Sequence, residues 1–128
     1  MTKLLPGVKR EDLAPAADPD EGVRVAREAA RQLKDVYGER LLDVVLFGSW
    51  VHGEPHEESD VDLLVVLDEV ADRAAERDRI VEILFDLEAD SHRAIQAFPV
   101  SRSDARSDGQ AFVGAALREG TTVLEGTV

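Results

Sequence analysis

The 128-residue sequence has no cysteine, only three lysines against twelve arginines, and no apolar stretch of the roughly 18 residues that a membrane span requires. Without cysteine there can be no disulfide framework and no thiolate metal site, which fits a cytoplasmic protein. The N-terminus also lacks the unbroken apolar segment of a signal peptide. At the length of one ordinary domain, the chain is expected to form a single small cytoplasmic domain with no membrane contact.

Positive charge is scarce as well. The chain has 15 basic and 27 acidic residues, and its formal net charge is -12 at pH 7. A surface this acidic repels nucleic-acid backbones, so we expect no broad, sequence-independent binding of DNA or RNA. An anionic substrate such as a nucleotide would need a divalent cation, a set of aimed backbone N–H groups, or both.

The first 17 residues differ from the rest of the chain. They contain Pro6, Gly7 and Pro15 and show no sustained period of apolar residues. This composition is typical of an N-terminal arm or a loosely attached lead-in. We therefore expect an arm over residues 1–17, which can be flexible, and a domain over residues 18–128.

Helical signals begin at the start of that domain. Asp18 can act as an N-cap, Pro19 suits the first helical position, and Glu21 lies three residues after the cap, as a capping box requires. Apolar residues then recur at helical spacing up to a stop at Gly38. Two further helices are expected over residues 72–89 and 110–119.

Short apolar runs rich in β-branched residues indicate strands. Residues 41–47 and 61–67 are the strongest, and both are typical of strands that are buried on two faces. Residues 93–100 form a weaker third strand, which Pro99 places at an edge or brings to an end. "TTVLEG" (residues 121–126) can add a last strand. The order of elements predicts an α/β (α+β) domain with helices packed on a mixed sheet.

Two aspartates border the start of the second buried run. Side chains alternate along a strand, so Asp60 and Asp62 are expected to point the same way, with their Cα atoms roughly 6.5 to 7 Å apart. Two carboxylates on one side repel each other unless something positive lies between them. Carboxylate oxygens are suitable ligands for Mg²⁺, which takes further oxygens from substrate phosphates.

A Gly-Ser pair follows the first buried run. Gly48 lets the backbone turn tightly and approach a ligand, and Ser49 offers a hydroxyl and an N–H. If Ser49 opens a short helical turn through Trp50 to Gly53, free N–H groups would face a phosphate. Trp50 then either stacks on a base or a partner, or packs beside the turn. A phosphate-binding turn beside a metal site indicates phosphoryl or nucleotidyl transfer.

The combined pattern Gly-Ser-x10-Asp-x-Asp, at Gly48, Ser49, Asp60 and Asp62, resembles the minimal nucleotidyltransferases of the DNA polymerase beta-like superfamily, as in HEPN/MNT toxin–antitoxin pairs. The likeness extends to the C-terminal "FVGAALREGTTVLEG" and covers about residues 18 to 126. It implies the nucleotidyltransferase fold, ATP phosphates bound at Gly48 and Ser49, and Mg²⁺ bound by the catalytic residues Asp60 and Asp62.

The chain departs from this family at two positions. His52 stands where the family often has arginine, and Gln96 stands where active members usually place a third carboxylate. A neutral amide cannot take a proton from an acceptor hydroxyl. These departures leave two hypotheses for the activity.

The first hypothesis is a Mg²⁺-dependent nucleotidyltransferase that moves AMP from ATP to a hydroxyl of a small helical HEPN-type partner, with this chain as the antitoxin. The second is a catalytically weak or inactive nucleotide-binding or interaction module that neutralises its partner by binding. A purely structural role, which predicts no thermal shift with Mg-ATP, is a third alternative. Assembly into a homo-oligomer stays open under all three.

Overall fold

The computed structural model describes residues 18–51, 60–106 and 111–124, so the arm expected over residues 1–17 and the position of His52 lie outside the described part of the chain. In chain order its elements are α2 (Pro19–Tyr37), η1 (Gly38–Arg40), β1 (Leu41–Phe47), η2 (Gly48–Trp50), β2 (Val61–Leu67), α3 (Arg73–Ser91), β3 (Ile95–Ser101), α4 (Arg102–Arg106), α5 (Ala111–Glu119) and β4 (Thr121–Thr122). None of the described helices has the length and apolar character needed to cross a membrane.

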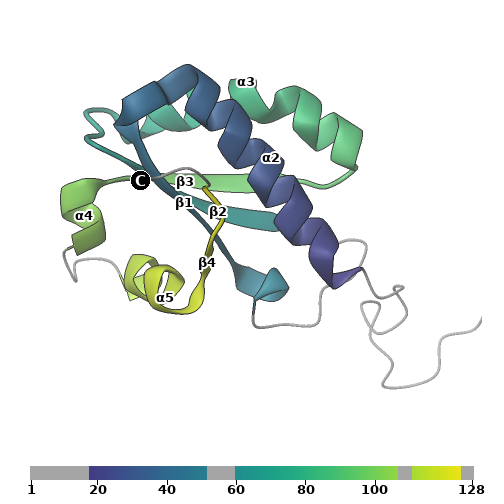
Figure 1. Cartoon of the computed structure of the whole chain (residues 1–128). Coiled ribbons are helices and arrows are strands. Elements are labelled where there is room, and N and C mark those ends of the chain that lie inside the picture. Colours follow the sequence, from purple (N-terminus) through teal and green to yellow (C-terminus); the bar gives the residue numbers. More distant parts are fainter. Residues whose placement is uncertain (1–17, 52–59, 107–110, 125–128) are drawn as a thin grey trace, which may run out of the picture.

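The strands form one four-stranded sheet in the order β3-β2-β1-β4 (Figure 1). β1 pairs antiparallel with both β2 and β4, whereas β2 and β3 are parallel and are joined through α3. The mixed sheet predicted from the sequence is therefore confirmed. β3 lies at an edge of the sheet, which explains why Pro99 is tolerated within it.

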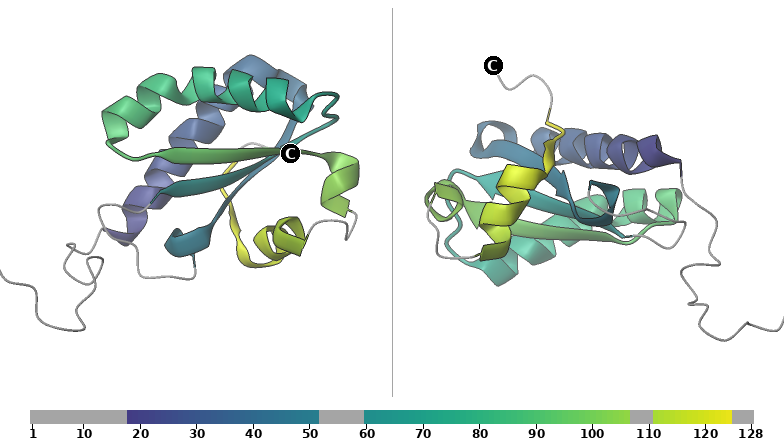
Figure 2. Two further views of the ribbon diagram at one scale, coloured as in Figure 1. Left: turned by 180° about the vertical axis from the view of Figure 1, so that it is seen from behind. Right: turned by 90° about the horizontal axis from the view of Figure 1, so that it is seen from below.

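Helices cover both faces of this sheet. α2 and α3 lie on one face, while α4 and α5 lie on the other (Figures 1 and 2). Along β2, Val61, Leu63, Val65 and Leu67 pack into the cluster on the α2 and α3 side, and Leu64 and Val66 into the cluster on the α5 side. The prediction that this run is buried on two faces is thus confirmed. Asp62 is half-buried on the α5 side of the sheet, at the start of the strand.

The ends of α2 follow the local chemistry of its sequence. The Asp18 carboxylate accepts the backbone N–H of Asp20 at 3.0 Å, and Pro19 occupies the first turn. At the other end, Gly38 has φ 59° and donates its N–H to the carbonyl of Lys34. Glu21 does not complete a capping box, because its carboxylate binds Arg93, 72 residues further along the chain.

Several element boundaries differ from those predicted. The third strand begins at Ile95 rather than at residue 93, because His92 ends α3 with φ 57° and turns the chain. Helix α4 was not predicted, although Ser101 accepts the N–H of Asp104 in the manner of an N-cap. Of the expected last strand, β4 comprises Thr121–Thr122, which pair with β1; the N–H of Val123 also donates to the carbonyl of Val44 at 2.9 Å, and residues 125–126 lie outside the described part of the chain.

Candidate active site

The turn after β1 brings the two halves of the sequence motif together. Gly48 has φ 82°, a conformation that residues with a Cβ rarely adopt. A Cβ at this position would lie 2.5 Å from Oδ2 of Asp62, so the side chain of Asp62 lies against the glycine backbone. The N–H of Val51 donates to the carbonyl of Gly48 at 3.0 Å and closes the turn. This turn is the 3-10 segment Gly48–Trp50, one residue earlier than the helical turn expected from Ser49.

Three neighbouring strands align the polar residues of the site. Asp62 pairs with Phe47 of β1 on one side and with Gln96 of β3 on the other. The Gln96 amide nitrogen donates to Oδ2 of Asp60 at 2.9 Å. The sheet register therefore brings Asp60, Asp62 and Gln96 together beside the Gly48 turn.

The electrostatics of this group favour a cation. Burial raises the pKa of the Asp62 carboxyl above its ordinary value, and the negative charge of Asp60 raises it further. Among the residues that the structure describes, no three His, Cys, Asp or Glu side chains are grouped to hold a metal. Two carboxylates alone fit an ion such as Mg²⁺, which keeps several waters and takes remaining ligands from substrate phosphates.

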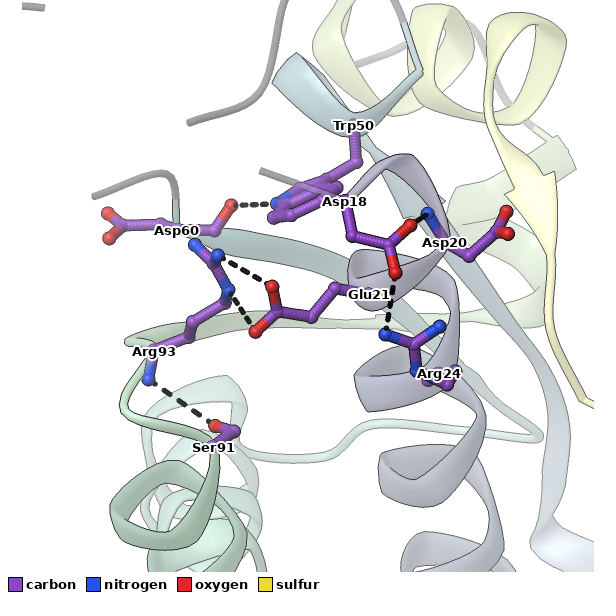
Figure 3. Close-up of polar contacts among 8 residues, drawn as sticks. All are labelled: Asp18, Asp20, Glu21, Arg24, Trp50, Asp60, Ser91 and Arg93. Carbon is purple, nitrogen blue, oxygen red and sulfur yellow. Dashed lines mark hydrogen bonds and ion pairs between the residues drawn. The ribbon is translucent and has the colours of Figure 1, made fainter. Parts of the chain in front are cut away.

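Trp50 belongs to the same region but packs within the protein, the second of the two alternatives considered from the sequence. Its indole Nε1 donates to the backbone carbonyl of Asp60 at 3.0 Å (Figure 3). The guanidinium of Arg93 lies over the indole ring, 4.8 Å from its centre. On the α2 side, a Cβ at Gly22 would lie 2.2 Å from the indole. The partly buried indole thus contacts α2, Arg93 and the residue that precedes β2.

Arg93 and Glu21 are the residues near the site that the sequence did not reveal. Arg93 is 6% exposed, and its Nε and Nη2 donate to the two carboxylate oxygens of Glu21 at 3.0 and 2.9 Å (Figure 3). This pairing holds the pKa of Glu21 below its usual range. The signal in the sequence is an arginine that begins a mostly apolar run, which is too weak to identify a buried pair.

A groove on the described part of the chain lies elsewhere. It has a volume of about 780 Å³ and is formed by the first half of α3 and the edge strand β3, with Arg73, Arg77, Phe98 and Pro99 among its lining residues. Neither aspartate of the motif lines it. Residues 52–59, which connect the two halves of the motif, lie outside the described part of the chain. The site is therefore identified by its geometry and chemistry and not by cavity size.

Comparison with known proteins agrees with this geometry. The family described as "Nucleotidyltransferase domain" matches residues 26–102, which is more than half of the chain and includes the motif and Gln96. The chain therefore belongs to the nucleotidyltransferase-domain family, as the resemblance of its motif indicated.

Relatives with similar sequences occur in Methanocaldococcus jannaschii. "Putative protein adenylyltransferase MJ0141" is 32% identical over 63 residues, covering 49% of this chain and 63% of the relative. The similarly named MJ0604 is 40% identical over 45 residues, covering 35% of this chain and 45% of the relative. "Putative protein adenylyltransferase MJ1305" is 35% identical over 54 residues, covering 42% of this chain and 37% of the relative. The matched segment thus spans less than two thirds of each of these relatives.

Two solved structures share the fold. One is described as a crystal structure of a toxin–antitoxin with AMP-PNP; it has a TM-score of 0.55 and 20% identity, covering 76% of this chain and 71% of that one. The other is a crystal structure of a mutant of the toxin–antitoxin MntA-HpeT. It has a TM-score of 0.50 and 16% identity, covering 84% of this chain and 73% of that one. At these identities the likeness establishes the fold, and the nucleotidyltransferase architecture expected from the sequence is confirmed.

Proposed function

We propose that the chain is a Mg²⁺-dependent nucleotidyltransferase that moves AMP from ATP to a hydroxyl of a partner protein. The observation that carries this proposal is the contact of the Gly48 turn with Asp62, beside Asp60. A glycine turn that a phosphate can approach and a carboxylate pair that needs a cation are the two requirements for binding a metal-nucleotide. The names of the relatives as protein adenylyltransferases support AMP as the transferred group.

In this proposal, the chain mainly binds and orients the nucleotide. Gly48 and Ser49 would hold the β- and γ-phosphates, while Asp60 and Asp62 would hold Mg²⁺. Bound there, the ion would supply charge neutralisation at the phosphate oxygens. The acceptor oxygen forms a bond to the α-phosphorus as the bond to pyrophosphate breaks, and the acceptor proton passes to a base.

Gln96 does not provide a general base for the proton of the acceptor hydroxyl. Its amide donates to Asp60 and has no basic lone pair, so it cannot act as the base. We propose that the proton passes either to a carboxylate of the partner or to solvent. The toxin–antitoxin pairs among the fold neighbours support a protein partner, and we propose a small helical HEPN-type protein with this chain as its antitoxin.

The proposal is tested by mixing the chain with labelled ATP, Mg²⁺ and a candidate partner, the protein encoded by the neighbouring reading frame. We expect an added AMP on the partner by intact mass. Asp60→Asn and Asp62→Asn should each slow transfer by about 100-fold. Losing a residue that only orients a metal ligand already costs up to about 100-fold. Asp68→Asn is a matched control, because Asp68 follows the other end of β2 and pairs with Arg40. Loss of transfer in all three variants would contradict the assigned site.

A second function is favoured by one observation, the hydrogen bond from Gln96 to Asp60. An amide in place of a third carboxylate suits a module that holds nucleotide and neutralises its partner by contact alone. This function predicts no AMP adduct, with complex formation unchanged by Asp60→Asn and Asp62→Asn. The same experiment therefore separates the two functions.

A further inference from the structure

Trp50 joins the two ends of the motif. It directly follows Ser49 in the turn, and its indole N–H donates to the carbonyl of Asp60, ten residues later. This bond links the backbone of Asp60 directly to the turn. The Asp60 side chain has a second restraint, the amide of Gln96. The backbone and the carboxylate of Asp60 are thus each held by one side-chain donor.

The position of Trp50 is fixed in turn by residues from two other segments. Arg93, which precedes β3, lies over the indole and donates twice to Glu21 in the first turn of α2. A guanidinium that is paired with a carboxylate and stacked on a ring has little rotational freedom. The backbone of α2 at Gly22 also packs closely against the indole, because a Cβ at Gly22 would lie 2.2 Å from it.

We infer that Trp50 is a positioning residue that holds the phosphate-binding turn and the metal-binding carboxylate Asp60 in register, and that the Glu21–Arg93 pair holds Trp50. The inference rests on the proposed function, since it assigns these residues an effect on Mg-nucleotide binding. Partners that orient a metal ligand without touching the metal typically change affinity or activity by about 10- to 100-fold when removed.

An equivalent cluster at the opposite end of α2 provides a matched control. The Tyr37 hydroxyl donates to Glu76 at 2.6 Å, and the guanidinium of Arg40 lies 5.5 Å from the centre of its ring. This cluster also combines an aromatic donor, an arginine and a glutamate. It lies roughly 25 Å away along the 19-residue helix. Tyr37→Phe and Trp50→Phe therefore each remove one hydrogen bond that an aromatic side chain donates, at different distances from the site.

The test measures binding of AMP-PNP by calorimetry as Mg²⁺ is titrated, together with the thermal midpoint of each variant. Trp50→Phe keeps an aromatic ring and removes the donor, so the Mg²⁺ concentration for half-maximal binding should rise about 10-fold. Tyr37→Phe should leave that concentration unchanged, even where its thermal midpoint falls. Arg93→Lys loses the planar fork and should shift the Mg²⁺ dependence in the same direction as Trp50→Phe.

A double variant tests whether Arg93 affects the Mg²⁺ dependence through Trp50. If Arg93 acts through Trp50, the Trp50→Phe/Arg93→Lys chain should show the Mg²⁺ dependence of Trp50→Phe alone, whereas independent effects would add. An unchanged Mg²⁺ dependence in Trp50→Phe, or an equal change in Tyr37→Phe, would overturn the inference. A wild-type chain that binds Mg-AMP-PNP without transferring AMP overturns only the proposed transferase activity, and one that binds none overturns both.

Discussion

Within the described part of the chain, two glycines have positive φ, and they differ in the atoms that lie beside them. Gly48 has φ 82° and lies against Asp62, whereas Gly38 has φ 59° with no neighbouring atom within 4 Å of a Cβ. Both conformations disfavour a side chain. Only at Gly48 would an added methyl group also displace a carboxylate of the site.

Gly48→Ala should therefore lower both stability and nucleotide binding, while Gly38→Ala should lower stability alone. Backbone strain of this kind costs about 1 to 3 kcal/mol. Urea denaturation and titration with Mg-AMP-PNP measure the two effects separately. Normal nucleotide binding by a folded Gly48→Ala chain would contradict the contact with Asp62.

Tyr37 gives a second prediction at this scale, because it is the only tyrosine in the chain. Burial, reinforced by the hydrogen bond to Glu76, raises the pKa of Tyr37 from 10.0 to about 12. A raised pKa favours the protonated phenol in the folded state, so its contribution to stability is complete below pH 10 and disappears as the pH rises towards 12. The tyrosinate absorbance should titrate near 12 in the folded protein and near 10 in denaturant. A midpoint near 10 in both would contradict the buried contact.

At the scale of the element, α3 shows how one helix turns adjacent residues to opposite environments. Leu84 is 3% exposed in the core, and Phe85 is 69% exposed on the outer surface. Leu84→Ala should reduce the free energy of unfolding by about 2 to 5 kcal/mol, as in other cores. Phe85→Ala should change it by no more than about 0.5 kcal/mol, as is usual on surfaces. Equal losses in urea denaturation would contradict the orientation of α3.

The elements also show what the sequence can predict. β1 and β2 were predicted with their observed bounds, because seven-residue apolar runs that contain β-branched residues are too short for a typical helix and favour buried strands. α4 was missed because five residues are too few to show a helical period. In the candidate site, the motif spacing predicted the grouping of Gly48 with Asp62. It could not predict Glu21 with Arg93, because a contact across 72 residues depends on the finished packing of α2 and β3.

At the scale of the whole molecule, net charge opposes folding. A chain with a formal charge of -12 repels itself more strongly when compact than when unfolded. Added NaCl should therefore raise the thermal midpoint at neutral pH, since the screening length falls to about 10 Å at 0.1 M salt. Glu82→Gln combined with Asp86→Asn removes two exposed negative charges of α3 and should reduce this salt dependence. A midpoint that falls with salt would indicate that ion pairs outweigh the repulsion.

The sheet of the whole molecule also aligns three strands at the site. Gln96 lies in register with Asp62, and its amide donates to the Asp60 carboxylate. Glutamate has the length and shape of glutamine, so a carboxylate at this position would need no change in the sheet. Either glutamine codon becomes a glutamate codon by exchanging its first nucleotide. In genetic terms, a site with two carboxylates and a site with three are thus separated by a single point mutation.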